Sequence, residues 1–127
     1  MDYYLKVSPE MGRGLYTGYV GIQKAKLIAQ CELLIFDEFD TVLVNQTNLK
    51  YYTFKYNDKQ DCLVLGDGEI FNHSDTPNVG YKLMTVDDRK VMVFYALRDI
   101  AKDEQLFIDY NADIKVDVKS YMGKDMF

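Results

Sequence analysis

The sequence contains no tryptophan, only two cysteines and only one histidine among its 127 residues. Two cysteines without a second pair exclude a disulfide framework and a cysteine-rich zinc site, so we expect a reduced, intracellular protein without a metal. The longest apolar runs, such as residues 91–97, are far too short to cross a bilayer. The N-terminus has no basic region followed by an apolar run, and it therefore predicts no secretory signal.

Positively charged residues are also outnumbered, because the sequence has 15 Lys and Arg and 20 Asp and Glu. Nucleic acid is therefore not an expected partner, since binding to it draws on clustered Lys and Arg. The net charge of −5 would attract a basic partner instead, although an acidic composition is also ordinary for solubility. A hydrophobic content of 48% argues against disorder, and the length fits a single domain over residues 1–127.

Most of the chain reads as short strands separated by polar turns. The clearest pattern is a hairpin over residues 79–97, in which two alternating runs flank a turn at 87–89. A turn is expected at residues 8–14, and residues 37–48 fit no element. Further strands are expected at residues 2–7, 15–20, 27–29, 33–36, 51–56, 62–65 and 106–110. The pattern predicts one compact, mainly β domain with little helix.

Residues 66–78 stand out as the candidate site. A short apolar run ends in two glycines, and an Asn-His-Ser triplet and a Pro-Asn pair follow. Glycines allow positive φ, and short polar side chains hydrogen-bond neighbouring backbone groups, so this segment is expected to form a fixed, irregular turn. His73, the single histidine of the chain, lies within it.

Tyrosine is the most unusual component of the composition, with eleven copies beside seven phenylalanines. These side chains could simply fill strand faces and half-buried positions. They could also line a pocket with phenol rings. Composition alone favours the first reading and leaves the second open.

Four segments in a fixed order resemble the SET domain of protein-lysine methyltransferases, in particular its minimal viral and bacterial forms without flanking cysteine-rich regions. The segments are residues 12–16, 52–54, 65–78 and 96–110. Gly-x-Gly and Asp-Tyr are individually weak signals, whereas Asn-His-Ser-x-x-Pro-Asn followed by a strand pair and Ile-Asp-Tyr is specific. The resemblance covers about residues 5–111.

The resemblance implies a β-clip fold of several small curled sheets, with a C-terminal segment threaded beneath a surface loop as a pseudoknot. This threading would bring Asn72 and His73 against Tyr110. The tail, residues 112–127, becomes a candidate cover for the cofactor. The minimal viral forms suggest a homodimer by analogy. A cytoplasmic location is expected, or a nuclear one in a eukaryotic host.

The resemblance also implies S-adenosylmethionine as cofactor and a lysine of a basic protein, such as a histone-like tail, as substrate. The implied catalytic residues are Tyr110 and Tyr52. The implied cofactor contacts are Gly12, Arg13, Gly14, Asn72, His73 and Tyr110. The implied lysine channel is lined by Tyr52, Tyr81 and Tyr95. The sequence departs from the family pattern at Asp67 and Glu69, which add charge where the chain enters the site.

The implied reaction needs a neutral lysine amine, and removing its proton near pH 7 costs roughly 4–5 kcal/mol. An aromatic channel and a neighbouring sulfonium both lower the pKa of that amine, so no dedicated base is required. Alignment of the reactants can supply roughly 7–11 kcal/mol. His73 could act as a general base, but a structural role or a cofactor contact is favoured. The alternatives are an inactive SET-fold module that binds peptide or cofactor, and a purely structural β domain.

Overall fold

The computed structural model describes residues 3–10 and 12–110, and the predictions made for the tail lie outside this part of the chain. The described residues group into two compact units. Unit 1 comprises residues up to 30, 70–81 and 93–110, and unit 2 comprises 31–69 and 82–92. Both units are built mainly from strands, as predicted.

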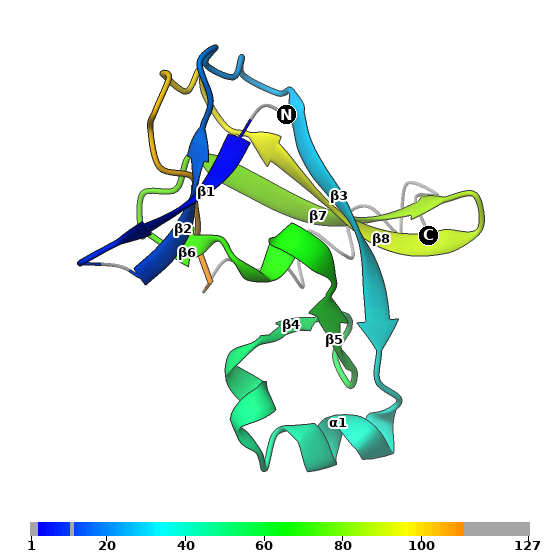
Figure 1. The fold of residues 1–127 in the computed structure, drawn as a ribbon. Coiled ribbons are helices and arrows are strands. Elements are labelled where there is room, and N and C mark those ends of the chain that lie inside the picture. The colour runs from blue at the N-terminus through cyan, green and yellow to red at the C-terminus, as the bar shows by residue number, and fades with distance from the viewer. Residues whose placement is uncertain (1–2, 11, 111–127) are drawn as a thin grey trace. The chain divides into compact units, whose positions relative to one another are not determined.

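Unit 1 begins with an antiparallel ribbon of β1 (Tyr3–Ser8) and β2 (Gly12–Thr17), drawn in blue in Figure 1. The predicted turn over residues 8–14 is wrong in extent, because Gly12 already pairs with Ser8. Gly12 has a φ of +68°, which glycine adopts at little cost. The chain can therefore reverse and re-enter the pairing at once, and Gly14 lies inside a strand.

A short parallel pair joins two distant parts of unit 1. Strand β6 (Asn72–His73) pairs with β9 (Phe107–Ile108), with Asn72 opposite Phe107 and His73 opposite Ile108. The strand predicted at residues 106–110 is thus much shorter than expected. The pairing brings the Asn-His pair beside the residues that precede Tyr110. The threading of a pseudoknot stays a prediction.

The predicted hairpin is confirmed as β7 (Val79–Val86) and β8 (Arg89–Ala96). The two residues between the strands, Asp87 and Asp88, have φ of 50° and 64°. Positive φ at both positions is the geometry of a two-residue turn whose twist matches that of the strands. Aspartate tolerates this region better than most residues, which explains why no glycine is needed.

Strand β3 (Leu27–Ile35) is continuous, whereas the sequence predicted two separate strands. The two predicted strands left out residues 30–32, where Gln30 and Glu32 are exposed and Cys31 between them is buried, which is the alternation of a half-buried strand. Strands β4 (Thr53–Lys55) and β5 (Asp61–Val64) complete a five-stranded sheet of order β4-β5-β3-β8-β7. Three of these strands, β3, β7 and β8, contribute residues to both units.

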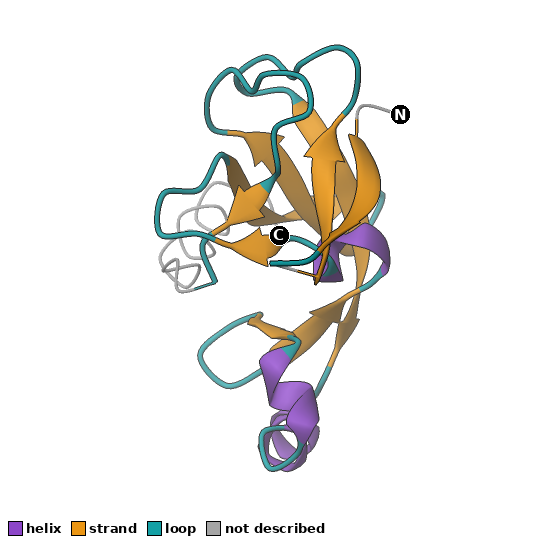
Figure 2. Cartoon of the chain, turned by 60° about the vertical axis from the view of Figure 1, so that its left-hand side comes forward, coloured by secondary structure: helices purple, strands orange, loops and turns teal. Residues whose placement is uncertain are grey.

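Residues 37–48, which the sequence left unassigned, contain helix α1 (Glu38–Val44), shown in purple in Figure 2. Asp37 caps this helix by accepting a hydrogen bond from the backbone N–H of Asp40 at 2.7 Å. A 3-10 turn, η1 (Asn48–Tyr51), follows and shortens the strand predicted at 51–56 to β4. At seven residues α1 is the longest described helix, and none of the described helices approaches the length of a membrane span.

Each unit has its own buried apolar side chains. In unit 1 these are Leu15, Ile22, Ile28, Phe71, Val79, Tyr81, Val93, Phe94, Ala96, Ile100, Leu106 and Ile108. In unit 2 they are Cys31, Cys62, Val64, Leu83, Val91 and Met92. Several of the unit 1 side chains come from the segments adjoining β6 and β9, so burial of these neighbours helps to hold the short parallel pair in place.

The turn before residue 70 contains a half-buried acid. It forms the 3-10 helix η2 (Gly66–Glu69), and the carboxylate of Glu69 accepts a hydrogen bond from the Val64 N–H at 3.0 Å. Burial raises the pKa of Glu69 from 4.5 to about 7, against the opposing effect of that hydrogen bond. Glu69 is therefore only partly ionised at neutral pH and contributes less charge than the sequence predicted.

Glu69→Gln is expected to stabilise the protein at alkaline pH only. The folded state takes up a proton between about pH 7 and 4.5 that the unfolded state does not, so stability rises as pH falls through this window. Above pH 8 the variant should be more stable by about 1–2 kcal/mol, after a discount for partial exposure. Urea denaturation at pH 8 and pH 4.5 measures this difference. Asp67→Asn is the control for loss of one charge, and an equal effect of Glu69→Gln at both pH values would contradict the assignment.

Candidate functional site

Tyr110 is held by the segment that contains the Asn-His pair. Its backbone N–H donates to Nδ1 of His73 at 2.9 Å, and its hydroxyl donates to the backbone carbonyl of Phe71 at 2.5 Å. The phenol ring lies 5.1 Å from the imidazole ring, at a tilt of 45°. Two hydrogen bonds, one from the backbone and one from the side chain of Tyr110, therefore hold it against residues at least 37 positions earlier in the sequence.

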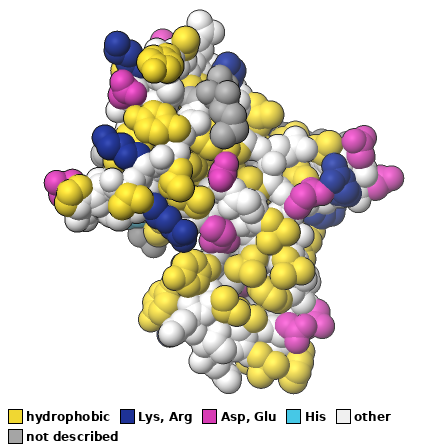
Figure 3. Space-filling view, viewed as in Figure 1, with side chains coloured by type: hydrophobic (Ala, Val, Ile, Leu, Met, Phe, Trp, Pro, Cys, Tyr) yellow, Lys and Arg dark blue, Asp and Glu magenta, His cyan; other side chains and the backbone are white. Residues whose placement is uncertain are grey.

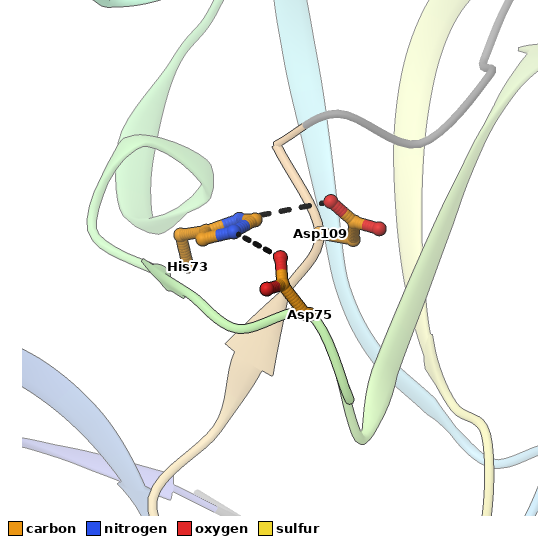
Figure 4. A group of neighbouring side chains, drawn as sticks. All are labelled: His73, Asp75 and Asp109. Atoms are coloured by element: carbon orange, nitrogen blue, oxygen red, sulfur yellow. Dashed lines mark hydrogen bonds and ion pairs between the residues drawn. The ribbon is translucent and has the colours of Figure 1, made fainter.

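Both ring nitrogens of His73 have interaction partners (Figure 4). Only an unprotonated nitrogen can accept the N–H of Tyr110, so in the neutral ring the hydrogen resides on Nε2. Nε2 lies 3.0 Å from a carboxylate oxygen of Asp75 and donates to it, and Nδ1 lies 3.7 Å from a carboxylate oxygen of Asp109. A metal ion or a transferred proton on Nδ1 would displace the bond to Tyr110. The geometry therefore favours a structural His73 over a general base.

Tyr81 supports the same segment from strand β7. Tyr81 is 6% exposed, and its ring lies 5.9 Å from the ring of Phe94. Its hydroxyl donates to the backbone carbonyl of Asp109 at 2.9 Å, one residue before Tyr110. Tyr81 was predicted to line a lysine channel. The structure places it beside the backbone that carries Tyr110, and its contact with substrate stays a prediction.

The glycine segment of β2 lies against two amide side chains. Nδ2 of Asn72 donates to the carbonyl of Arg13 at 3.0 Å. A Cβ on Gly14 would lie 2.5 Å from Nε2 of Gln105 and 2.9 Å from Nδ2 of Asn72. Only glycine leaves room for this approach. The sequence-predicted set of Gly12, Arg13, Gly14, Asn72, His73 and Tyr110 thus gathers in unit 1.

Gln105 carries an unusual polar atom. Its Oε1 accepts the hydroxyl of Tyr16 at 3.0 Å, whereas its buried Nε2 has no hydrogen-bond partner among the described residues. A buried donor without a partner costs roughly 1–3 kcal/mol, so its persistence beside Gly14 calls for an explanation. Sequence reasoning did not select Gln105, and a single glutamine gives no signal by which it could have done so.

The remaining predicted aromatics occupy different places. Tyr95 lies on β8, half-buried, with its ring tip over Gly80, where a Cβ would approach its Cζ to 2.7 Å. Tyr52 belongs to unit 2, where it caps η1 and is 52% exposed. The predicted roles of Tyr52 beside Tyr110, and of Tyr52 and Tyr95 along a channel, stay predictions.

Asn78 is a structural centre of unit 1 that sequence reasoning quoted in its motif without assigning it a role. It is 2% exposed. Its Oδ1 accepts the N–H of Phe107 at 2.8 Å, and its Nδ2 donates to the carbonyl of Gln105 at 2.8 Å. Its own carbonyl accepts the N–H of Leu97 at 2.9 Å. One buried amide thus fixes the approach to β9, and through β9 the position of Tyr110.

Neither cysteine is a candidate nucleophile. Cys31 and Cys62 are both buried and free. Burial raises the pKa of Cys31, and it raises the pKa of Cys62 to about 12. Both thiols therefore stay protonated at neutral pH.

Comparison with known proteins identifies the fold. The SET domain family model matches residues 12–111. The crystal structure of a Plasmodium falciparum protein proposed as a histone methyltransferase superimposes with a TM-score of 0.70 at 27% identity, over 88% of this chain and 95% of that one. The chain therefore belongs to the SET domain family, and the predicted SET fold is confirmed.

Two curated relatives are histone-lysine N-methyltransferases. The H3 lysine-4 specific protein of Aspergillus fumigatus is 51% identical over 45 residues, which cover 35% of this chain. The H3 lysine-37 specific protein of Schizosaccharomyces pombe is 38% identical over 65 residues, or 50% of this chain. The matched regions span 4% of the Aspergillus protein and 42% of the Schizosaccharomyces protein.

Proposed function

We propose that this chain is a protein-lysine N-methyltransferase that uses S-adenosylmethionine. The observation that carries the proposal is the double fixation of Tyr110, with its hydroxyl on Phe71 and its backbone N–H on His73. Membership of the SET domain family supports the same conclusion. The substrate is proposed to be a lysine in a basic protein segment, because the chain is acidic and its curated relatives are histone-lysine methyltransferases.

The residues of unit 1 fit the proposed cofactor. Apart from its chain neighbours, no atom of the described residues lies within 4 Å of the Cβ position of Gly12, so the backbone there has room for a ligand. Asn72 uses its Nδ2 on Arg13, and among the described residues no donor bonds its Oδ1. The unpartnered donor of Gln105 lies alongside. A ligand with both ammonium and carboxylate groups matches this set of acceptors and donors. Gly12, Arg13, Gly14, Asn72, His73 and Tyr110 are proposed to hold it.

When bound, S-adenosylmethionine supplies an electrophilic methyl group on a sulfonium. Tyr110 donates its only hydroxyl hydrogen to Phe71, so toward any further group its phenol oxygen can act only as an acceptor, which suits a positively polarised methyl group. A fixed oxygen of this kind stabilises charge without reorganising during the reaction. His73 and Tyr81 keep that oxygen in place through the backbone of residues 109 and 110.

The phenols of Tyr52, Tyr81 and Tyr95 are proposed to line the approach of the lysine. Aromatic walls exclude water and favour the neutral amine, which is the nucleophilic form. Phenol faces can also hold a methylated ammonium. Residues 1–127 are proposed to act as one domain, in the cytoplasm or in the nucleus of a eukaryotic host. A homodimer is proposed by analogy with the minimal viral forms alone.

Methyl transfer from radiolabelled S-adenosylmethionine to a mixture of basic proteins tests the proposed function. We expect label on lysine, and we expect S-adenosylhomocysteine to raise the melting temperature. An inactive SET-fold module is the second candidate, since its cofactor contacts would be the same. It predicts the thermal shift without transfer. A structural β domain predicts neither, and absence of both effects would overturn the proposal.

Gly14→Ala is expected to weaken cofactor binding as well as to lower stability. The new Cβ would displace the amide tips of Gln105 and Asn72, which can swing away at a cost of about 1–3 kcal/mol. The dissociation constant for S-adenosylhomocysteine, measured by calorimetry, should rise at least about tenfold, or roughly 1.4 kcal/mol.

Gly80→Ala is the matched control for Gly14→Ala. Its Cβ would crowd the ring of Tyr95 at 2.7 Å, and no atom of Asn72 or Gln105 is among its three nearest neighbours. We expect a similar loss of stability with unchanged affinity for S-adenosylhomocysteine. Equal effects of the two variants on affinity would show that the amide pair beside Gly14 does not contribute to the cofactor site.

A further inference from the structure

Helix α1 exposes its large apolar side chains, and its single buried residue is polar. Phe39, Val42 and Leu43 have the i, i+3, i+4 spacing of one helical face, yet they are 71%, 58% and 46% exposed. The buried residue of the helix is Thr41, whose hydroxyl accepts the N–H of Asp61 at 3.0 Å. The apolar stripe that normally packs a helix onto its own domain thus faces solvent.

The exposed stripe continues onto the turn that follows. Helix α1 contacts η1, where Leu49 and Tyr51 are 45% and 72% exposed. In Figure 3 hydrophobic side chains gather over the region of unit 2 that carries these elements in Figure 1. We define the α1 surface as Phe39, Val42, Leu43, Leu49 and Tyr51. A contiguous apolar patch of this kind commonly marks an interaction site.

Negative charge borders the α1 surface. Asp37 caps α1, and Glu38 and Asp40 stand in its first turn. Lys59 lies 3.9 Å from Glu38 in an exposed pair, which offsets little of this charge. In unit 2 as a whole, ten Asp and Glu against six Lys and Arg give a net charge of −4, out of −5 for the chain. The acidic excess therefore lies in the unit that also exposes the apolar stripe.

We propose that the α1 surface docks a basic segment of a partner protein that carries large apolar side chains. A second copy of this chain fits less well, because it would bring a second unit 2 of net charge −4 against the first, and α1 has no basic residue in its last turn to offset the acidic first turn. Residues 111–127 of the chain fit less well too, since their three Asp and three Lys give no net charge. The proposal concerns binding by unit 2 and does not depend on methyl transfer.

A labelled model peptide tests the docking surface. The probe is a fluorescein-labelled peptide of twelve residues with two Leu four positions apart and five Lys, titrated with the full chain and followed by anisotropy. Two companion peptides replace the Lys by Glu, or the Leu by Ser. We expect each companion to bind at least about tenfold more weakly. Binding of the probe should also weaken as salt rises from about 50 to 300 mM.

The variant Phe39→Ser/Val42→Ser should weaken probe binding at least about tenfold, since it removes two apolar contacts. Leu5→Ser/Val7→Ser is the matched control, because these β1 side chains are 54% and 72% exposed in unit 1. The control should bind like the wild type. Circular dichroism shows whether both variants are folded.

Four outcomes would overturn the proposal. Equal binding of the Glu companion would mean that charge plays no part. An equal loss of probe affinity in both double variants would mean that the probe does not bind at the α1 surface. A dimer by light scattering that Phe39→Ser/Val42→Ser disperses would make a second copy the occupant. Tighter probe binding by Tyr121→Ser/Phe127→Ser would make the chain's own tail the occupant. None of these readouts involves transfer, so failure here is separate from failure of the proposed function.

Discussion

Replacing Tyr110 by phenylalanine is expected to reduce methyl transfer at least about a hundredfold while the protein stays folded and binds cofactor. Removal of a fixed polar group that stabilises charge in a transition state typically costs this much. The ring itself remains, so its contact with His73 at 5.1 Å and the backbone bond from residue 110 to Nδ1 are kept. The side chain is 55% exposed, so the lost bond to Phe71 should cost no more than about 1 kcal/mol.

Initial rates with radiolabelled cofactor measure this effect, and calorimetry with S-adenosylhomocysteine measures binding separately. Tyr19→Phe is the matched control, because Tyr19 is 97% exposed and should give wild-type rates. Transfer by Tyr110→Phe within threefold of the wild type would remove Tyr110 from the chemistry. Loss of cofactor binding in parallel with transfer would make it a binding residue only.

The sequence predicted which distant segments lie together better than it predicted the elements around them. The motif at residues 72–78 and the tyrosine at 110 are short and specific, and the parallel pair of β6 with β9 does bring them together. By contrast, two separate strands were predicted at residues 27–29 and 33–36, and the polar residues Gln30 and Glu32 lie between them inside the single strand β3. In a half-buried strand polar residues belong on the outer face, so local polarity alone cannot distinguish a turn from a strand edge.

Helix α1 was missed for a related reason. Its apolar residues have helical spacing, but its length of seven residues is too short for a clear period, and its stripe faces solvent. A sequence pattern that assumes inward-facing apolar residues does not detect a helix whose apolar residues are exposed. The same holds for Gln105, whose buried amide becomes visible only when Gly14 and Tyr16 are placed around it.

Asn78 shows how a motif residue can serve the site without contacting a substrate. Its amide bonds both the N–H of Phe107 and the carbonyl of Gln105, at 2.8 Å each. These groups flank Leu106 and lead directly into β9, which pairs with β6 and positions Tyr110. Loss of this amide should therefore loosen the element on which the proposed catalytic hydroxyl depends.

Asn78→Ala is accordingly expected to lower the free energy of unfolding by about 3–5 kcal/mol. It leaves one buried N–H and one buried carbonyl without partners, at roughly 1–3 kcal/mol each, and opens a cavity where a side chain was 2% exposed. Urea denaturation followed by far-UV circular dichroism measures the change. Asn48→Ala is the matched control, because Asn48 is exposed and should change stability by less than about 0.5 kcal/mol. A loss below 1 kcal/mol in Asn78→Ala would mean that water replaces the amide, and that β9 is held by its apolar neighbours alone.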